Sequence, residues 1–595
     1  MKRILALISA ISMIVVSLLP LAASAQVGGC GGDCSPYPDS HPVDSRQFGS
    51  WSVSLIGSGD TGHYGIESMK VDRDLVAWTE VDRNPESGEI ENRLLVVFDG
   101  LGTRILASLD AEDWDRDAGN GFFDHVSGNY DVADGAVVWI QTDGFDREVW
   151  IHRDGHTSRV SDNSYDDRHP VTSLGRVAWT SLPGGAYNLM VSDRRGVRKL
   201  DSYHVMNYAF SGRNLFWLNR LPHEDWFRVF REDGTRQDAV GEGDDRPLPD
   251  YFLSDGQGTV AWEYSTKKWD YDKRVVYLSP DGGQAVRVIQ RDVPPNITRV
   301  EDVRGSEVLL NVHDLLTSML FDVSLIRADG GVTDEYLTRQ MAMSRARFTD
   351  SGVVRHLVPE TSSALLYRDD ASGYEDYLTL DHVIHDRFEA QDGTVIGALL
   401  KGGVILHRDG AATEVASDRS ASAVATSGDA AAWIETDGDS WYLYAAQPLV
   451  TVRTSQGVRQ VSGRLVKSPE HPAVYLAARD GRRYTFPSEG QFYSWYEDFS
   501  PLSVIGATEL AARPLGGNVL YRPGSRLLKT ALSPAVYIVG ENGILHWVTD
   551  AQVLEDVYGQ GWQRHIAVIP DSHLADYTFG ESIGDIYGYH MALVE

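Results

Sequence analysis

A strand that ends in tryptophan recurs along most of this chain, and its spacing constrains the fold more than any other feature. Small apolar residues precede the Trp in segments such as DLVAW, GRVAW and GTVAW. Successive copies lie 61, 40, 38, 45 and 171 residues apart, and the last gap divides into four steps of about 43. Degenerate copies occur at those steps, near Leu310, Val354 and Ile396. The tryptophans, which we expect to be buried between repeats, are Trp78, Trp139, Trp179, Trp217, Trp262 and Trp433.

A second signature follows most copies: a strand that reaches Asp-Gly and returns, as in EVWIHRDGHTSRV (148–160) and GVILHRDGAATEV (403–415). Asp-Gly supplies the positive φ angles of a tight hairpin turn. Each unit therefore contains about four short strands in about 40 residues, which is typical of a propeller blade. A row of separate sandwich domains is the alternative, but each sandwich would need about 80 to 100 residues.

The sequence predicts an all-β protein in which residues 50–461 form a closed β-propeller of seven to nine blades. Nine units can be counted between about 66 and 461. Because nine-bladed rings are rare, we expect eight, with one unit misread or lying outside the ring. The segment SWSVSLIG, which precedes the first unit, is a candidate for the strand that closes the ring against the last blade.

The segments SYDDRHPVTSLGRVAWTS (164–181) and GDDRPLPDYFLSDGQGTVAW (243–262) place an acidic turn, a Pro and a Gly turn before the Trp strand. In this pattern the region resembles the TolB-type family of bacterial propellers, which implies the fold. TolB itself begins with an α/β domain of which this sequence shows no trace, so its role in the envelope is not implied.

Residues 463–585 repeat themselves. HPAVYLAARDGRRYTF (471–486) and SPAVYIVGENGILHWV (533–548) match at an offset of 62. Each copy predicts two strands and a helix, so we expect a small α+β domain made of two ββα repeats, followed by a tail at 586–595. Neither copy has enough apolar surface to be stable alone, so a shared core is expected. Its aromatic members would be Tyr475, Trp495, Tyr537 and Trp547.

The helices of these repeats have recognisable ends. Ser488 with Gln491, and Thr549 with Gln552, have the spacing of a capping box, and Gly559 suits a C-terminal cap. The segments SPAVY, GRRYTFPSE and ELAARPLGGN resemble a repeat at the ends of secreted bacterial proteins. That resemblance implies surface biology and no reaction.

The chain begins with a predicted signal peptide, residues 1–25, in which Lys2 and Arg3 precede an apolar run and Ala-Ser-Ala. An uncleaved membrane anchor is the alternative. In the Gly- and Pro-containing segment 26–49 we expect a disulfide between Cys30 and Cys34. Lipid attachment at Cys30 and a thiol redox site are the other interpretations.

Cleavage would change the net charge from −31 to −33, because two basic residues are removed. A chain this acidic repels phosphate backbones, and we therefore do not expect nucleic acid as a partner. No second apolar stretch is long enough to span a membrane. We therefore expect a secreted, periplasmic or cell-surface protein of unknown oligomeric state.

The acidic segment DWDRDAGNGFFD (113–124) has the spacing of a calcium loop, with Asp113, Asp115, Asp117 and Asp124 as the metal ligands. Ala118 stands where such loops prefer Gly, and a solvated acidic loop is the alternative. The recurring acidic turns place further carboxylates at blade rims, where we expect turn capping rather than catalysis. These are Asp166, Asp167, Asp244 and Asp245.

The sequence contains no Gly-x-Ser-x-Gly elbow, no His-Glu-x-x-His and no Gly-rich phosphate loop. We therefore expect a binding or scaffold protein of the bacterial envelope, without enzymatic activity, whose ligand is an envelope protein or a glycan. The alternative is an extracellular polysaccharide hydrolase or lyase with its active site in the propeller funnel.

Overall fold

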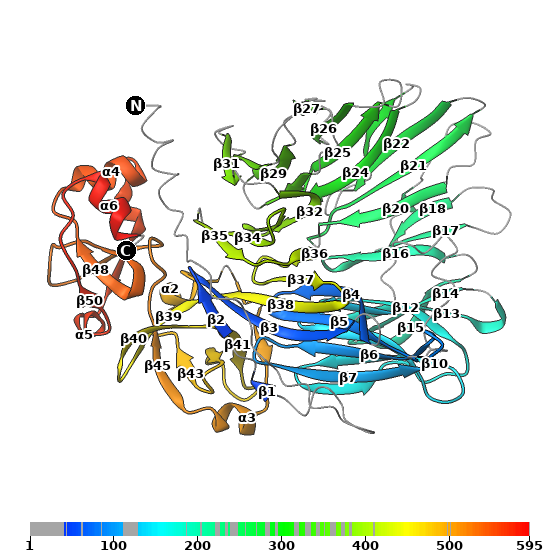
Figure 1. Cartoon of the computed structure of the whole chain (residues 1–595), viewed down its shortest axis with the longest axis horizontal. Coiled ribbons are helices and arrows are strands. Elements are labelled where there is room, and N and C mark those ends of the chain that lie inside the picture. The colour runs from blue at the N-terminus through cyan, green and yellow to red at the C-terminus, as the bar shows by residue number, and fades with distance from the viewer. Residues whose placement is uncertain are drawn as a thin grey trace.

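The computed structural model describes most residues between 41 and 593, with gaps of which the longest is 111–128 (Figure 1). It is mostly β, and the described strands of the propeller region form nine successive four-stranded blades, of which the first eight are meanders in chain order. Most of the strands of the first four blades are β4 (Tyr64–Asp72), β5 (Leu75–Arg83), β6 (Ile90–Phe98), β7 (Gly102–Asp110), β8 (Tyr130–Ala133), β9 (Ala136–Thr142), β10 (Arg147–Arg153), β11 (His156–Arg159), β12 (Asp167–Ser173), β13 (Arg176–Ser181), β14 (Asn188–Asp193), β15 (Gly196–Asp201), β16 (Val205–Ser211), β17 (Asn214–Arg220), β18 (Phe227–Arg231) and β19 (Arg236–Gln237).

The fifth to eighth blades continue the series. Their strands are β20 (Leu248–Ser254), β21 (Val260–Lys268), β22 (Tyr271–Ser279), β23 (Val286–Arg291), β24 (Asn296–Arg304), β25 (Glu307–Asp314), β26 (Leu320–Arg327), β27 (Glu335–Gln340), β28 (Ala346–Phe348), β29 (Gly352–Leu357), β30 (Ala364–Asp369), β31 (Glu375–Thr379), β32 (Val383–Gln391), β33 (Thr394–Leu399), β34 (Gly403–Arg408) and β35 (Ala411–Ala416).

The ninth blade combines both ends of the propeller region. It contains β36 (Ser420–Thr426), β37 (Ala431–Asp437) and β38 (Ser440–Pro448), and its outermost strand is β3 (Trp51–Asp60). The register of β3 on β38 runs antiparallel from Trp51 opposite Pro448 to Asp60 opposite Ser440. The segment that the sequence suggested for closure therefore does close the last blade. A short strand, β2 (Ser45–Phe48), extends this blade beyond β3.

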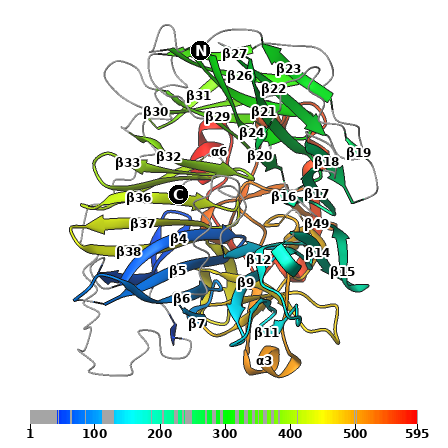
Figure 2. The same cartoon turned by 90° about the vertical axis from the view of Figure 1, so that its right-hand side faces the viewer.

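The first strands of consecutive blades contact one another around the ring, and β36 of the ninth blade contacts β4 of the first. Figure 2 shows these strands around a common centre. In seven of the nine sheets the pairing of first with second strand contains a register shift, as at Ile66/Ser68 and Val300/Asp302. A bulge at the same place in successive blades increases the local twist in the same way each time.

The tryptophans of the repeat lie on the second strands of their blades. The exposed fraction of each side chain is 7% or less for Trp78, Trp139, Trp179, Trp217, Trp262 and Trp433. Several of them donate the indole N–H to the residue two positions later, which lies on the same face of the strand. Trp78 donates to Glu80 over 2.7 Å and Trp433 donates to Glu435 over 3.1 Å. A buried Trp needs such an acceptor for its polar edge.

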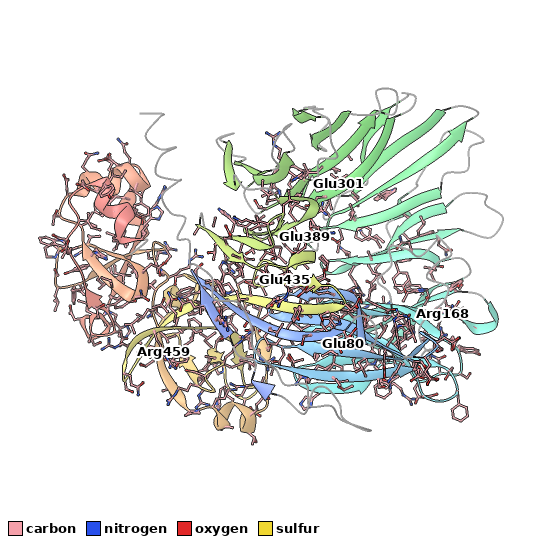
Figure 3. All side chains as sticks on the ribbon, in the orientation of Figure 1. Glu80, Arg168, Glu301, Glu389, Glu435 and Arg459 are labelled. Atoms are coloured by element: carbon pink, nitrogen blue, oxygen red, sulfur yellow. The ribbon has the colours of Figure 1, made fainter. Side chains whose placement is uncertain are left out.

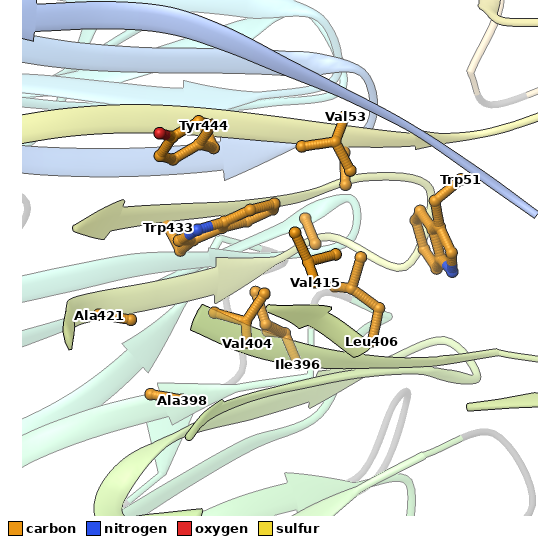
Figure 4. Packing of buried hydrophobic residues seen from close by; sticks show 12 residues of the cluster. Trp51, Val53, Ile396, Ala398, Val404, Leu406, Val415, Ala421, Trp433 and Tyr444 are labelled. Atoms are coloured by element: carbon orange, nitrogen blue, oxygen red, sulfur yellow. The ribbon is translucent and has the colours of Figure 1, made fainter. Parts of the chain in front are cut away.

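One apolar cluster joins the eighth and ninth blades (Figure 4). Trp433 stacks on Tyr444, with ring centroids 5.3 Å apart. Trp51 and Val53 of β3 complete this cluster, while Ile56 of β3 belongs to the cluster between the ninth and first blades. The closing strand therefore supplies core side chains to both of its neighbours.

The count of nine sheets in the described chain is at the upper end of the expected range and exceeds the eight blades that we expected. The degenerate copies explain the difference. Leu310, Val354 and Ile396 are completely buried on β25, β29 and β33, the second strands of their blades. Aliphatic residues thus occupy the place of Trp in three blades, and no unit was misread.

Aspartates near the turns between first and second strands link neighbouring blades. Asp72 accepts a hydrogen bond from the backbone N–H of Gly135 in the next blade. Asp131 accepts one from Thr172, and Asp302 accepts one from Phe348. Each carboxylate satisfies a backbone donor of the following blade, which fixes how neighbouring blades are rotated.

The C-terminal region contains two repeats of one topology. The first has β41 (Gly463–Lys467), β42 (Tyr475–Ala478), β43 (Arg483–Thr485), α2 (Glu489–Phe492), β44 (Ser503–Val504), α3 (Ala507–Ala512) and β45 (Leu515–Val519). The second has β46 (Leu527–Thr530), β47 (Tyr537–Val539), β48 (Ile544–Trp547), α4 (Ala551–Tyr558), β49 (Ile566–Ile569), α5 (Asp571–Leu574) and β50 (Thr578–Phe579). The helix α6 (Ile586–Ala592) follows.

Strand pairing repeats exactly as the sequence does. Strand β41 pairs with β42 and, in parallel, with β44, and β46 pairs in the same way with β47 and β49. The parallel pair β43–β45 corresponds to β48–β50. Each repeat is thus larger than the expected ββα unit and forms a five-stranded sheet. A hairpin, β39 (Val450–Thr454) and β40 (Gly457–Val461), joins the first sheet through β45, although our boundary placed it with the propeller.

The two repeats share one apolar cluster, but of the four aromatic residues that we expected there only Tyr537 packs on it. In this cluster Leu520 and Tyr521, which directly follow β45, meet residues of the second repeat such as Leu528. Trp495 packs on the cluster of the first repeat that includes Tyr484, and Tyr475 packs on its other face. The surface of Trp547 is 48% exposed. The extra strands and helices give each repeat enough apolar surface for clusters of its own.

The helix ends agree with the sequence at two of three positions. Ser488 accepts from the N–H of Gln491 at the start of α2, and Gly559 ends α4 with φ 74°. Helix α4 starts one residue later than predicted, because Asp550 rather than Thr549 accepts from the N–H of Gln552. Among the described residues, no helix is both long and apolar enough to cross a membrane.

Replacing Trp433 by Ala should lower the melting temperature clearly, because it empties a site in the core between two blades and leaves Glu435 without its indole donor. Losses of about 3–5 kcal/mol are typical of a buried aromatic residue. Phe145, which is 97% exposed, is the control, and Phe145→Ala should leave the thermal melting curve unchanged. Equal melting temperatures for the two variants would contradict this role of Trp433.

Removal of residues 524–595 should leave the first repeat folded, because two of its apolar clusters contain no residue beyond Val519. Only the cluster of Leu520 and Tyr521 loses its partners. Limited proteolysis of that truncated protein should yield a stable fragment that ends near residue 523. Rapid digestion back to the propeller would instead show that the first repeat depends on the second.

Candidate functional site

The C-terminal repeats lie against one end of the ring (Figure 1). We call this end the capped face; it carries the turns from first to second and from third to fourth strands. Arg464 of the first repeat pairs with Asp99 over 3.6 Å, and the N–H of Val504 donates to Asp154 over 3.0 Å. Both aspartates lie in turns from third to fourth strands. The opposite end, which we call the open face, carries the loops from second to third strands and the connections between blades.

Five acidic side chains gather on the open face between the second and third blades. Asp143 and Asp146 lie in the loop from β9 to β10, and Glu148 lies on β10. Asp166 and Asp167 end the connection from β11 to β12. We call these five residues the carboxylate site. Arg168, next to it on β12, appears in Figure 3 far from Arg459 of the capped face.

A buried hydrogen-bond network holds the inner part of this site. Glu148 and Asp167 are completely buried. Glu148 accepts from the hydroxyl of Ser161 over 2.5 Å and from the N–H of Asn163 over 2.7 Å. The side-chain amide of Asn163 donates to Asp167 over 2.9 Å. The connection between the blades thus joins the two buried carboxylates through one asparagine and one serine.

The outer part of the site reaches solvent. Asp166 accepts from the N–H of Arg147 over 3.3 Å, and its side chain is 40% exposed. Asp143 pairs with Arg159 over 3.0 Å. Asp146 is partly exposed, and its Oδ2 is shielded from solvent without a hydrogen-bond partner among the described residues. Oδ1 of the buried Asp167 also has no hydrogen-bond partner among the described residues, so Asp146 is the partly exposed member of the site with an oxygen left for a ligand.

Burial and like charges raise the pKa values in this site. Burial is the main reason that the pKa of Asp167 rises to about 7, with a further increase from Glu148. Desolvation, followed by Glu148, Asp143 and Asp166, raises the pKa of Asp146. Carboxyl groups with such pKa values can give or take a proton near neutral pH, which is what general acid–base chemistry requires.

The same residues could hold a cation. One oxygen each of Asp143, Asp146 and Glu148 lies within 4.8 Å of the others, and carboxylate oxygens are the ligands that calcium and magnesium prefer. Arg159 and Ser161 already neutralise or satisfy two members of the group. The arrangement is therefore compatible with a cation and does not require one.

The sequence-predicted site residues are placed as follows. The calcium loop with Asp113, Asp115, Asp117 and Asp124 lies outside the described residues, as do Cys30, Cys34, Asp244 and Asp245. Of the expected turn caps, Asp166 and Asp167 lie in the carboxylate site, and Asp167 is the first residue of β12.

Sequence reasoning missed Asp143, Asp146 and Glu148. Their segment, TDGFDRE, contains an Asp-Gly pair, but it connects second to third strand rather than ending the hairpin of the repeat. The available signal was the cluster of acids in a single short loop between two strands. Their proximity to Asp166 and Asp167 arises only when the blades pack side by side.

Comparison with known proteins adds information on the fold. No family model and no curated protein matches this sequence. A search of solved structures finds the β-propeller domain of the trilobed protease from Pyrococcus furiosus, at 10% identity and a TM-score of 0.32, covering 60% of this chain and 96% of that one. It also finds uncomplexed acylaminoacyl peptidase from Pyrococcus horikoshii, at 12% identity and a TM-score of 0.32, covering 63% and 58%.

A puromycin-hydrolysing peptidase from Mycobacterium tuberculosis matches at 14% identity and a TM-score of 0.31, covering 66% of this chain and 61% of that one. This chain thus spans about three fifths of the length of the two full-length peptidases. The likeness concerns the propeller fold alone.

These neighbours correct two of our expectations. They are peptidases, which contradicts a binding or scaffold protein of the envelope, and the expected alternative, a polysaccharide hydrolase or lyase, is of a different kind. They are also enzymes, which contradicts the expectation of a protein without enzymatic activity. The expectation of no enzymatic activity rested on the absence of catalytic motifs, among them the serine-hydrolase motif, from the sequence.

The raised pKa of Asp167 predicts a pH-dependent stability. Its pKa is about 7 in the folded protein against 3.8 for the free group, so the folded state loses stability as the pH rises from about 4 to about 7. Asn at this position cannot ionise. The melting temperature of Asp167→Asn relative to the unmodified protein should therefore be a few degrees higher at pH 8 than at pH 5. A difference independent of pH would show that Asp167 is ionised in the folded protein.

Proposed function

We propose that this protein is an extracytoplasmic hydrolase of peptides and that the carboxylate site is its reacting centre. The observation that carries the proposal is the buried Glu148–Asn163–Asp167 network beneath Asp146, whose Oδ2 has no hydrogen-bond partner among the described residues. Hydrolysis by general acid–base chemistry needs a group that can exchange protons, and burial and the neighbouring carboxylates raise the pKa of Asp146 above its ordinary value.

The division of roles follows burial. Asp146 reaches solvent and is the candidate for proton transfer to or from the reacting water. Asp166, held by the N–H of Arg147 and 3.6 Å from the Arg168 guanidinium, contributes a second carboxylate beside it. Glu148 and Asp167 are inaccessible, so they act as positioning residues that keep the loop in place below Asp146.

Peptides fit the surroundings of this site better than anionic substrates do. The five carboxylates outnumber the neighbouring Arg147, Arg159 and Arg168, so the rim repels phosphate and sulfate groups. Phe145 projects beside the site with 97% of its surface exposed and offers apolar contact. A peptide that combines basic and apolar side chains satisfies both features. Peptide hydrolysis is also the activity named for the solved structures, although the likeness to them concerns the fold alone.

The remaining parts of the proposal rest on the sequence. We assign the propeller repeats to the TolB type and the doubled ending to the repeats of secreted bacterial proteins, on the segments quoted above. The basic and apolar start of the chain supports export, and the location is secreted, periplasmic or at the cell surface. Calcium at Asp113, Asp115, Asp117 and Asp124 is retained as a proposal with melting in calcium and in chelator as its test.

The test is hydrolysis of a mixed peptide library by the purified protein, with mass spectrometry of the products. Asp146→Asn should reduce the initial rate by about 100-fold or more, as is typical for loss of a general acid or base. Asp439→Asn is the matched control, because Asp439 is an exposed acid in the corresponding loop of the ninth blade. No cleavage by the unmodified protein with or without calcium, or equal rates for the two variants, would exclude this function.

A further inference from the structure

The N-terminal strands of the propeller receive hydrogen bonds from the C-terminal repeats. Strand β3 closes the ninth blade, and β2 pairs with it as the outermost strand. Figure 1 shows both strands beside the first C-terminal repeat. Residues of the N-terminal strands and of the C-terminal repeats therefore meet where β3 pairs with β38 and closes the ring. We call this place the seam.

Arg479 makes the first connection. It lies in the turn between β42 and β43, and its Nη1 donates to the hydroxyl of Ser54 on β3. Its Nη2 donates to Gln447 on β38 over 2.8 Å, and its Nε donates to the carbonyl of Gly100 over 2.9 Å. The guanidinium also stacks over Phe98, 4.8 Å from the ring centroid. One side chain thus joins both strands of the seam to the first blade.

The environment of this guanidinium is closed. Ser54, Gln447 and Phe98 are buried, and burial lowers the pKa of Arg479 to about 10, so it remains charged at neutral pH. A buried charge that lost these acceptors would be left without compensation. The turn can therefore leave the seam only if water replaces the acceptors that the guanidinium loses. Otherwise the unpaired buried charge costs a large free energy.

The second repeat makes a corresponding connection. Glu541 lies in its equivalent turn, between β47 and β48, and accepts from Gln460 on β40 over 3.3 Å. Gln460 in turn accepts from Gln47 on β2 over 2.7 Å. The offset of 62 that aligns the repeats also aligns Arg479 with Glu541. The same turn of each repeat is therefore linked to the N-terminal hairpin, directly in one case and through a glutamine in the other.

From this geometry we infer that the duplicated C-terminal region is a two-point clasp that holds the N-terminal hairpin β2–β3 in the last blade. Strand β3 pairs with the ring along one edge only, through β38, which lies at the other end of the propeller region in sequence. An outer strand of this kind opens at a lower free energy than the inner strands do. The clasp raises the free energy needed to open these strands locally. Because there are two repeats, Arg479 can hold β3 while Glu541 holds β2.

The test is hydrogen exchange of the full chain, followed in peptides that cover β3 and, as a reference, β13. Arg479→Ala should accelerate exchange of β3 by about tenfold or more and leave β13 unchanged, because only the local opening is affected. Arg479→Lys keeps the charge but cannot make all three hydrogen bonds, so its effect should be intermediate. Glu541→Ala should accelerate exchange of β2 with a smaller effect on β3.

Arg482→Ala and Glu581→Ala are the controls, because both side chains are exposed in the same repeats and neither is among the seam contacts described above. Neither should change exchange of β2 or β3. The inference is overturned if Arg479→Ala matches Arg482→Ala at β3, or if β3 and β13 accelerate equally in both Arg479 variants. Unchanged exchange of β2 in Glu541→Ala would overturn the part assigned to the second repeat.

Discussion

The pairing of β3 with β38 is the interaction on which the rest of the structure depends. It supplies the fourth strand of the ninth blade, and its side chains complete the apolar clusters on both sides of that blade. Without it, the faces of the eighth and first blades that pack on the ninth would be exposed in part. Closure also removes a strand edge that a large sheet would otherwise have to protect.

Around the rest of the ring, blades are held by a device that repeats with the fold. An aspartate near the first turn accepts a backbone N–H from the next blade, as Asp72, Asp131 and Asp302 do. The open face lacks this regularity, because its loops differ in length and composition from blade to blade. The capped face therefore maintains the architecture, and the variable loops of the open face are free to carry chemistry.

The sequence predicted the propeller, the buried tryptophans and the closing strand, because each leaves a local pattern that repeats or stands beside a repeat. It predicted the duplication at the end for the same reason. The blade number was underestimated, because Leu310, Val354 and Ile396 occupy the buried position of Trp in their blades but do not match the Trp pattern. The carboxylate site could not be predicted as a whole, because Asp146 and Asp166 belong to different blades and Asp146 is not part of the repeat pattern. Arg479 and Glu541 could not be recognised in the same way, because the duplication is visible only where the two copies agree and these two residues differ in charge.

The ring closure has a consequence for the order in which the chain can fold. Strand β3 is made early and its partner β38 is made about 390 residues later, so blades that form in between have no completed ring to join. A product of synthesis or cleavage that ended before Pro448 would keep a long, largely apolar strand without a partner, which is a target for proteases and a seed for aggregation. Because of this topology, only a chain that has been translated through its last blade can bury β3.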